Sequence, residues 1–421
     1  MDSLNYIIKK LKNKKNVFLT GGAGVGKTTM TKEIIKHYET EAKKVAKLAS
    51  TGMAATLLGG QTLHSFFDLG IASDIKELEL NSKLEISKKV KKLISGMDLI
   101  VIDEISMVSD ALLDMISLRL HQADFMGSVL VVGDFLQLPP VVRGYNEIKF
   151  AFESPSWDPF EFETVELTHI YRTDDKDFTG LLANIRDGLI DENIHNALNE
   201  FIRPLPQDLS EFTFLFGKND SASRHNKDQL EFIDDELHVK EARIIKHVKS
   251  VNDSQIQRFI NDAGIEKNML LKIGVPVLFT RNSWNYFNGE RGIVVNIDDT
   301  FVYVRKNNAS VIKLETVSQS KSVWKEKIVE GKKEMVEEEL FSIYQYPIKL
   351  AYAITIHKSQ GMSIEDLIIE TNEIFAPSQF YVAISRSSNP ARLNLIAPKR
   401  QWRDIVFVNK KALEFNRTKV S

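Results

Sequence analysis

The chain has 421 residues, and its 55 lysines and arginines against 57 aspartates and glutamates give a formal net charge of −2. With 43% hydrophobic and 27% charged residues, the composition is typical of a globular protein of two or three domains and excludes a largely disordered chain. No apolar run reaches the roughly 18 residues of a membrane span. Lysines interrupt the N-terminal segment, so no secretory signal is expected. The absence of cysteine excludes disulfides and thiolate zinc sites.

The first 160 residues alternate β-branched runs with helical stretches. Buried strands are expected at 17–20, 45–51, 98–104 and 128–134, and helices at 28–39 and 111–122. This alternation predicts an α/β domain whose parallel strands bind ligands at their carboxyl ends. A charged segment, 71–92, is expected to form a small helical or irregular insertion.

A second alternating region begins near Leu167, with a strand expected at 212–219 between helices at 177–188 and 221–233. From about residue 240 to 345 the pattern changes to short alternating runs with Asn-Gly and Asp-Asp turns, which is typical of a small antiparallel barrel or sandwich. The strands expected there are 246–251, 272–282, 288–298, 300–307 and 310–317, and residues 321–341 predict an exposed hairpin arm. Helical and parallel-strand patterns return at Tyr346.

The strongest chemical signal is the run 21–28, GGAGVGKT, a complete G-x-x-x-x-G-K-[ST] motif between an expected strand and an expected helix. Its glycines let backbone N–H groups approach phosphate oxygens, and the helix N-terminus adds its dipole. Lys27 is expected to reach the β- and γ-phosphates, and the Thr28 hydroxyl to bind Mg²⁺. The residues expected to bind the nucleoside triphosphate are Gly22, Ala23, Gly24, Val25, Gly26, Lys27, Thr28 and Thr29.

Two further strand ends carry polar residues suited to phosphate chemistry. Asp103 is expected to bind Mg²⁺ together with Thr28, and Glu104 to polarise water for in-line attack on the γ-phosphate. The alternative is that either acid only caps the following helix. Gln137, in GDFLQLPP, is expected to sense the γ-phosphate, with an ordinary loop as the alternative.

Seven motifs of the chain resemble, in their order, those of superfamily 1 helicases of the 5′→3′ branch. They are GGAGVGKTT, ASTGMAATLLGGQTLHSFF, DLIVIDEISMVS, GDFLQLPPV, LTHIYR, AYAITIHKSQGMSIEDLIIE and YVAISR. The match is to the petite-integration-frequency and RecD-like group. The resemblance implies two RecA-like α/β domains, 1A at 1–166 and 2A at 167–240 with 345–421. It also implies a small 1B or wedge insertion at about 66–92 and an SH3-like β-barrel insertion, 2B, at 241–344.

The same resemblance implies an ATP-dependent DNA helicase that translocates 5′→3′ on single-stranded DNA and unwinds duplex, with G-quadruplex DNA as a further candidate substrate. ATP and Mg²⁺ are the implied cofactors, and single strands and single-to-double-strand junctions the implied partners. A cytoplasmic, nucleoid-associated monomer with roles in DNA repair, recombination and telomere maintenance is expected. The alternatives are an ATP-switched single-strand-binding protein without unwinding and a small-molecule P-loop kinase.

Residue by residue, Arg172 in LTHIYR and Arg386 in YVAISR resemble the family's two γ-phosphate arginines, which the second domain supplies. The alternative is that they are surface arginines that cap helices. Gly361 is expected to approach the nucleotide through its backbone. The implied DNA contacts are Ser50, Thr51, Gly52, Thr62, His64, Phe66 and Pro139 on the first domain and Thr355, His357 and Lys358 on the second.

Two of these residues have a structural alternative to DNA contact. His64 could be a hydrogen-bonded histidine of the core, and Phe66 could be a packing residue of the core. The sequence also departs from the family, because residues 1–11 lack the glutamine that reads adenine, which leaves adenine specificity unexplained. The charge of −2 is not the basic excess usual for a nucleic-acid partner. We therefore expect DNA binding to be confined to a few loops, with few phosphate contacts and an affinity that depends only weakly on salt concentration.

Overall fold

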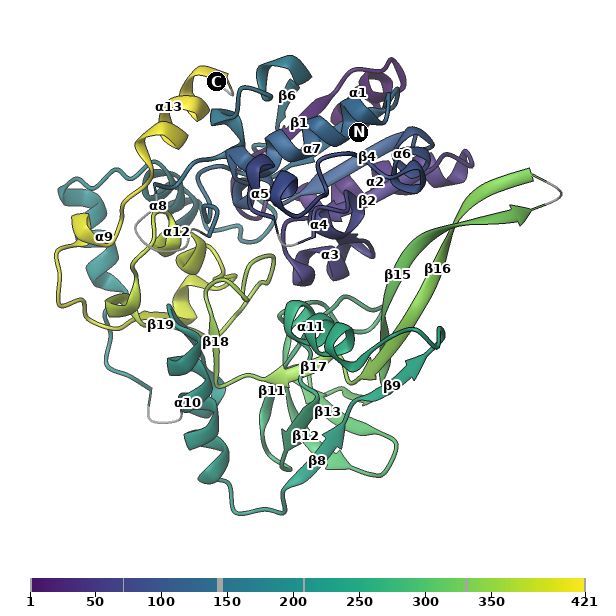
Figure 1. Cartoon of the computed structure of the whole chain (residues 1–421). Helices are drawn as coiled ribbons and strands as arrows, with labels where there is room; N and C mark the ends of the chain where they lie inside the picture. Colours follow the sequence, from purple (N-terminus) through teal and green to yellow (C-terminus); the bar gives the residue numbers. More distant parts are fainter. Residues whose placement is uncertain (1, 71, 142–146, 207–208, 330–331, 420–421) are drawn as a thin grey trace.

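The computed structural model describes residues 2–70, 72–141, 147–206, 209–329 and 332–419 (Figure 1). It contains two α/β units and a β-rich unit that is inserted in the second of them. None of the helices in these ranges is long and apolar enough to cross a membrane.

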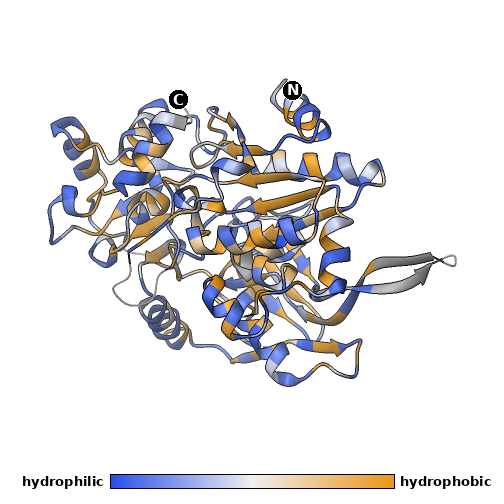
Figure 2. Ribbon diagram, turned by 45° about the horizontal axis from the view of Figure 1, so that its top comes forward, coloured by the Kyte–Doolittle hydropathy of each residue, from blue (hydrophilic) through white to orange (hydrophobic). Residues whose placement is uncertain are grey.

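The first unit is built on a six-stranded parallel sheet with the order β3-β2-β4-β5-β1-β6. Its strands are β1 (Val17–Thr20), β2 (Val45–Ala49), β3 (Gln61–Thr62), β4 (Leu99–Asp103), β5 (Ser128–Val132) and β6 (Glu163–Glu166). The central strands are apolar throughout because helices cover both faces of the sheet, and Figure 2 shows this concentration of hydrophobic residues.

In the described part of this unit, the α-helices are α1 (Asp2–Lys12), α2 (Lys27–Thr40), α3 (Gly52–Leu58), α4 (Leu63–Phe66), α5 (Ile75–Leu80), α6 (Lys88–Ser95) and α7 (Asp110–Gln122). Helices α5 and α6 begin within the charged segment 71–92, which was expected to be helical or irregular, and Ile71 lies outside the described residues. The buried Arg119 of α7 ties the insertion to the unit by donating to the carbonyls of Phe67 and Leu84. The insertion is therefore packed onto the first unit rather than loosely attached.

The second α/β unit has a four-stranded parallel sheet with the order β18-β7-β19-β20. Its elements are β7 (Thr213–Phe216), β18 (Ala353–Thr355), β19 (Leu367–Ile369), β20 (Leu393–Leu395), α8 (Lys176–Arg186), α9 (Glu192–Glu200), α10 (Asn219–Glu231) and α12 (Gln379–Ile384). The last helix, α13 (Lys410–Lys419), returns to the first unit, where Phe415 stacks on Phe152 with ring centroids 4.3 Å apart.

The β-rich unit centres on a five-stranded antiparallel sheet with the order β14-β13-β12-β11-β17. Its strands are β8 (His238–Glu241), β9 (Arg243–Lys246), β10 (Asn268–Leu271), β11 (Pro276–Phe279), β12 (Arg291–Ile297), β13 (Val302–Lys306), β14 (Val311–Leu314), β15 (Val317–Val329), β16 (Lys332–Gln345) and β17 (Ile348–Leu350). Strands β15 and β16 form the predicted hairpin arm, whose residues 330 and 331 lie outside the described ranges (Figure 1).

Two local predictions for this unit are wrong. No strand spans 246–251, because β9 ends at Lys246 and a turn follows. Helix α11 (Asp253–Ala263) was not expected in a β-rich region, although its signal is present in the sequence: Asn252 and Gln255 form a capping box, and Ile256, Ile260 and Ala263 share one buried face.

Candidate functional site

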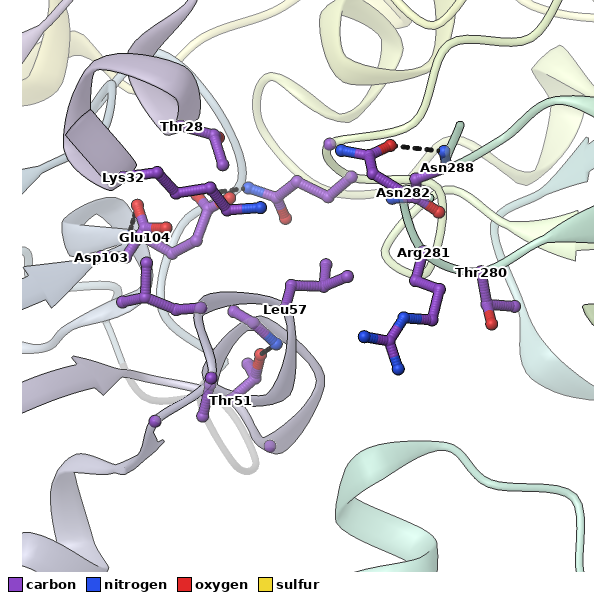
Figure 3. Close-up of a pocket in the computed structure, with 18 of the residues that line it drawn as sticks. Thr28, Lys32, Thr51, Leu57, Asp103, Glu104, Thr280, Arg281, Asn282 and Asn288 are labelled. Carbon is purple, nitrogen blue, oxygen red and sulfur yellow. Dashed lines mark hydrogen bonds between the residues drawn. The ribbon is translucent and has the colours of Figure 1, made fainter. Parts of the chain in front are cut away.

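The candidate site is a cavity of about 1310 Å³ where the three units meet. The first unit contributes the P-loop and the ends of β2 and β4, and the second contributes Arg172, Arg386 and the loop after β18. The β-rich unit contributes the loop 280–288. Figure 3 shows Lys32 and Leu57 of the first unit and Arg281 of the β-rich unit extending into the same space.

The P-loop has the backbone shape needed to cradle phosphate. Gly24 and Gly26 have φ angles of 79° and 87°, which glycine adopts without strain, and Gly26 caps the N-terminus of α2. Gly21 is equally constrained, because a Cβ there would lie 2.2 Å from the carbonyl oxygen of Leu167. Burial lowers the pKa of Lys27, whose Nζ donates to the carbonyls of Gly21 at 2.6 Å and Gly22 at 2.8 Å. Lys27 thus lies against the loop in which it is expected to bind phosphate.

The two acids predicted from the end of β4 line the same cavity. Glu104 has a left-handed backbone, φ 55° and ψ 48°, and its carboxylate faces into the site. Burial, reinforced by the neighbouring Asp103, raises the pKa of Glu104 to about 7, and burial also raises the pKa of Asp103. A carboxylate poised near neutral pH is suited to take a proton from water.

Both predicted arginines line this cavity, where Arg386 is 2% exposed and Arg172 is partly buried. Arg172 donates to the Ser363 hydroxyl at 2.9 Å and the Ser385 carbonyl at 2.6 Å, and Arg386 donates to the Ser385 hydroxyl at 2.9 Å. Burial lowers the pKa of Arg172 to about 10, and burial together with the positive charge of Arg172 lowers the pKa of Arg386 to about 9. Within the described ranges neither forms an ion pair with a carboxylate, so the pair favours an anion between the units.

The other predicted nucleotide contacts also line the cavity, except Gly22. Gln137 is 6% exposed, and its Nε2 donates to Asp134 at 3.4 Å. Gly361 has φ 78° and open space beside its Cα, as a close backbone approach to a ligand requires. Thr28 and Asp103 supply only oxygen atoms, which suits Mg²⁺ held mainly by phosphates, and no cluster of three or more metal-binding side chains occurs in the described part of the chain.

Half of the predicted DNA contacts line this cavity. Thr51, Gly52 and Thr62 do so from the first unit, and His357 and Lys358 from the second. Gly52 lies tightly against α11, because a Cβ there would come within 2.5 Å of the Asp262 carbonyl oxygen. The β-rich unit therefore contacts the first unit at one of the loops predicted to hold the strand.

Three other predicted DNA contacts are buried in this structure. Phe66 is 2% exposed and packs against Phe67 in the core of the first unit, so it follows the packing alternative. Pro139 is buried, and the buried Thr355 hydroxyl accepts a hydrogen bond from the Lys358 N–H at 3.4 Å. In this structure, these side chains take part in core packing and in a turn.

Ser50 and His64 do not line the cavity either. Ser50 Oγ is buried, and burial lowers the pKa of the half-buried His64, which favours its core alternative.

Sequence reasoning also missed functional candidates. Gln360 donates from its Nε2 to Glu104 Oε2 at 2.8 Å, although 256 residues separate the two in the chain. Ser363 was missed as well, and its hydroxyl accepts a hydrogen bond from Arg172. The position of Gln360 beside Gly361, in a stretch already expected at the site, was the available signal.

Comparison with known proteins gives matches to one helicase family. The sequence model of the PIF1-like helicases matches residues 3–196. The chain is 36% identical to the ATP-dependent DNA helicase Pif1 of Campylobacter jejuni, over 97% of this chain and 96% of that protein, and 34% identical to that of Bdellovibrio bacteriovorus, over 96% and 89%.

Solved structures agree with these sequence matches. Bacteroides sp. Pif1 in complex with ADP-AlF4 has a TM-score of 0.82 at 28% identity, covering 99% of this chain and 96% of that one. The unliganded Bacteroides sp. Pif1 has a TM-score of 0.83 at 28% identity, over 100% and 97%. The form bound to ssDNA has a TM-score of 0.64 at 29%, over 99% and 96%.

Proposed function

The chain belongs to the PIF1-like helicases and is an ATP-dependent DNA helicase, and from this we propose that it moves 5′→3′ along single-stranded DNA and unwinds the duplex ahead of it. Mg·ATP hydrolysis between the two α/β units would drive the movement. The observation that supports hydrolysis between the units is the pair formed by the partly buried Arg172 and the buried Arg386, whose guanidinium groups the second unit holds at the P-loop of the first without a carboxylate partner among the described residues.

In the proposed reaction, the P-loop amides and Lys27 bind the phosphates. Thr28 and Asp103 would hold Mg²⁺, and the ion would supply charge neutralisation. Glu104 accepts the proton of the attacking water, and Gln137 orients toward the γ-phosphate. Arg172 and Arg386 stabilise the charge that develops on the transferred group, an effect that is about 10³–10⁵ in rate for an arginine finger.

Supplying the acid-base group and the arginines from different units makes hydrolysis depend on the distance between the units. Closure brings Arg172 and Arg386 to the phosphates, and loss of the γ-phosphate removes the anion that holds the two guanidinium groups together. A cycle of closing and opening follows from each turnover, which is the requirement for directed movement on a strand.

The strand itself is proposed to lie along Thr51, Thr62, His357 and Lys358, with Arg281 on the facing loop. Hydroxyls, amides and few cations hold a backbone without reading bases. Helix α11 lies against Gly52, next to Thr51 of this path, and we propose that the β-rich unit shifts when a strand binds. The greater similarity to the unliganded than to the ssDNA-bound Bacteroides form supports this step.

Two assays separate this proposal from an ATP-switched binder that does not unwind. Both proteins would bind single strands with an affinity that depends on nucleotide, but only a helicase displaces a labelled strand from a tailed duplex at a rate set by ATP. Strand binding and DNA-stimulated hydrolysis without displacement would favour the switch. G-quadruplex unwinding is tested by the same displacement assay with a folded tail.

A further inference from the structure

Asp134 is the centre of a second contact between the two α/β units. It follows β5 and is 1% exposed. Its Oδ1 accepts from the Leu136 N–H at 3.1 Å and from Arg186 Nη2 at 2.9 Å, and its Oδ2 accepts from Arg186 Nε at 3.1 Å and Gln137 Nε2 at 3.4 Å. One carboxylate therefore joins the loop that carries Gln137 to a cation of the other unit.

Arg186 is the last residue of α8 and approaches Asp134 in a two-point geometry that only arginine provides. The pair is shielded from water, with side-chain exposures of 14% for Arg186 and 0% for Asp134. Burial alone would raise the pKa of Asp134, but the charge and hydrogen bonds of Arg186 bring it below its ordinary value. Asp134 is thus held as a carboxylate by a group from the second unit.

The P-loop is held at the same contact. The Tyr381 hydroxyl of α12 accepts a 2.8 Å hydrogen bond from the Ala23 N–H. A Cβ at Gly22 would lie 3.1 Å from that hydroxyl and 3.8 Å from Arg186 Cδ. The second unit therefore touches both the P-loop and the loop of Gln137 at a place distinct from Arg172 and Arg386.

We propose that Arg186 is a positioning residue for Gln137 and acts through Asp134. The contact with the second unit fixes the carboxylate, and the carboxylate fixes the side-chain amide of Gln137 at the cavity. When the units separate, Asp134 loses its partner and Gln137 loses its anchor. The geometry of the γ-phosphate sensor is in this way tied to the position of the second unit. This inference rests on the proposed hydrolysis of ATP at the cavity.

The test compares the full-length chain with its Arg186→Gln, Asp134→Asn and double variants in steady-state ATP hydrolysis on single-stranded DNA. For Arg186→Gln we expect kcat to fall by about tenfold or more while the KM for ATP stays within about threefold, because transition-state contacts are lost and ground-state binding is kept. In the double variant an amide replaces the unpaired buried carboxylate, and kcat should recover in part. The exposed Arg403→Gln of the same unit is the matched control.

Titration of each variant with ADP–aluminium fluoride gives the fraction of chains with an intact site, so that rates are expressed per competent chain. A normal kcat per competent chain for Arg186→Gln, or a double variant no better than the single, would overturn the inference. Failure of the unsubstituted chain to hydrolyse ATP would instead overturn the proposed function, and the two failures are therefore distinct.

Discussion

The side-chain amide of Gln360 donates a 2.8 Å hydrogen bond to Oε2 of Glu104, across the boundary between the two α/β units. Glu104 is the residue best placed to activate water, and Gln360 lies one residue before Gly361 and two after Lys358, which line the cavity on the second unit. In this conformation one oxygen of the general base is already occupied. The hydrogen bond therefore links the loop that carries Lys358, a proposed DNA contact, to Glu104, the proposed general base.

We expect Gln360→Ala to weaken the dependence of hydrolysis on DNA. With the amide gone, Glu104 is free to accept a proton before a strand has moved the second unit, so basal turnover should rise relative to DNA-stimulated turnover. The ratio of the two rates, measured in one preparation, is the readout, with the exposed Gln401→Ala as control. An unchanged ratio would show that the hydrogen bond does not restrain the base.

The pH profile should report Glu104 directly. Its pKa is raised to about 7, and only the carboxylate form accepts a proton, so kcat/KM for ATP should rise with pH through about 7 and level off above it. Below that midpoint the rate should fall about tenfold per pH unit. A profile that is flat between pH 6 and 8 would contradict the assignment, and Glu104→Gln should abolish turnover at every pH while ATP binding persists.

Lys27→Ala should abolish ATP turnover and leave binding of single-stranded DNA nearly intact, because Lys27 contacts the P-loop carbonyls and none of the proposed strand path. Phosphate release and fluorescence anisotropy of a labelled oligonucleotide measure the two properties. Lys9→Ala, exposed on α1, is the control. Retained turnover would exclude the P-loop assignment.

Arg386→Ala should lower kcat by about 10³ with a small change in ATP affinity, since the arginine serves the transition state. Arg386→Lys should restore little, because a single ammonium replaces a guanidinium whose donors already hold Ser385 and Val382. Single-turnover hydrolysis at saturating ATP gives the comparison. A loss confined to KM would mean that Arg386 only binds substrate.

The nucleotide half of the site could be predicted from the sequence because each part of it is a short, contiguous motif. The run 21–28 lies between a strand and a helix that the sequence also predicts, and Asp103 and Glu104 lie at the end of a strand that its apolar residues predict. Arg172 and Arg386 were predicted through family resemblance alone, since nothing local to either residue points to the P-loop.

The other features depend on packing between distant segments. Whether Phe66 stacks on a base or fills the core is decided by neighbours such as Phe67 and α7, and the turn after β18 occupies the Thr355 hydroxyl. Gln360 and Arg186 find their partners across the boundary between the units, 256 and 52 residues away. Such pairings become visible only when the units are placed together.

The most direct test of the account is strand displacement from two duplexes that differ only in the polarity of a single-stranded tail. With ATP and Mg²⁺, the chain should displace the labelled strand from the 5′-tailed duplex, while Lys27→Ala displaces none. Equal or greater displacement from the 3′-tailed duplex, or none from either under conditions where ATP is hydrolysed, would contradict a 5′→3′ helicase.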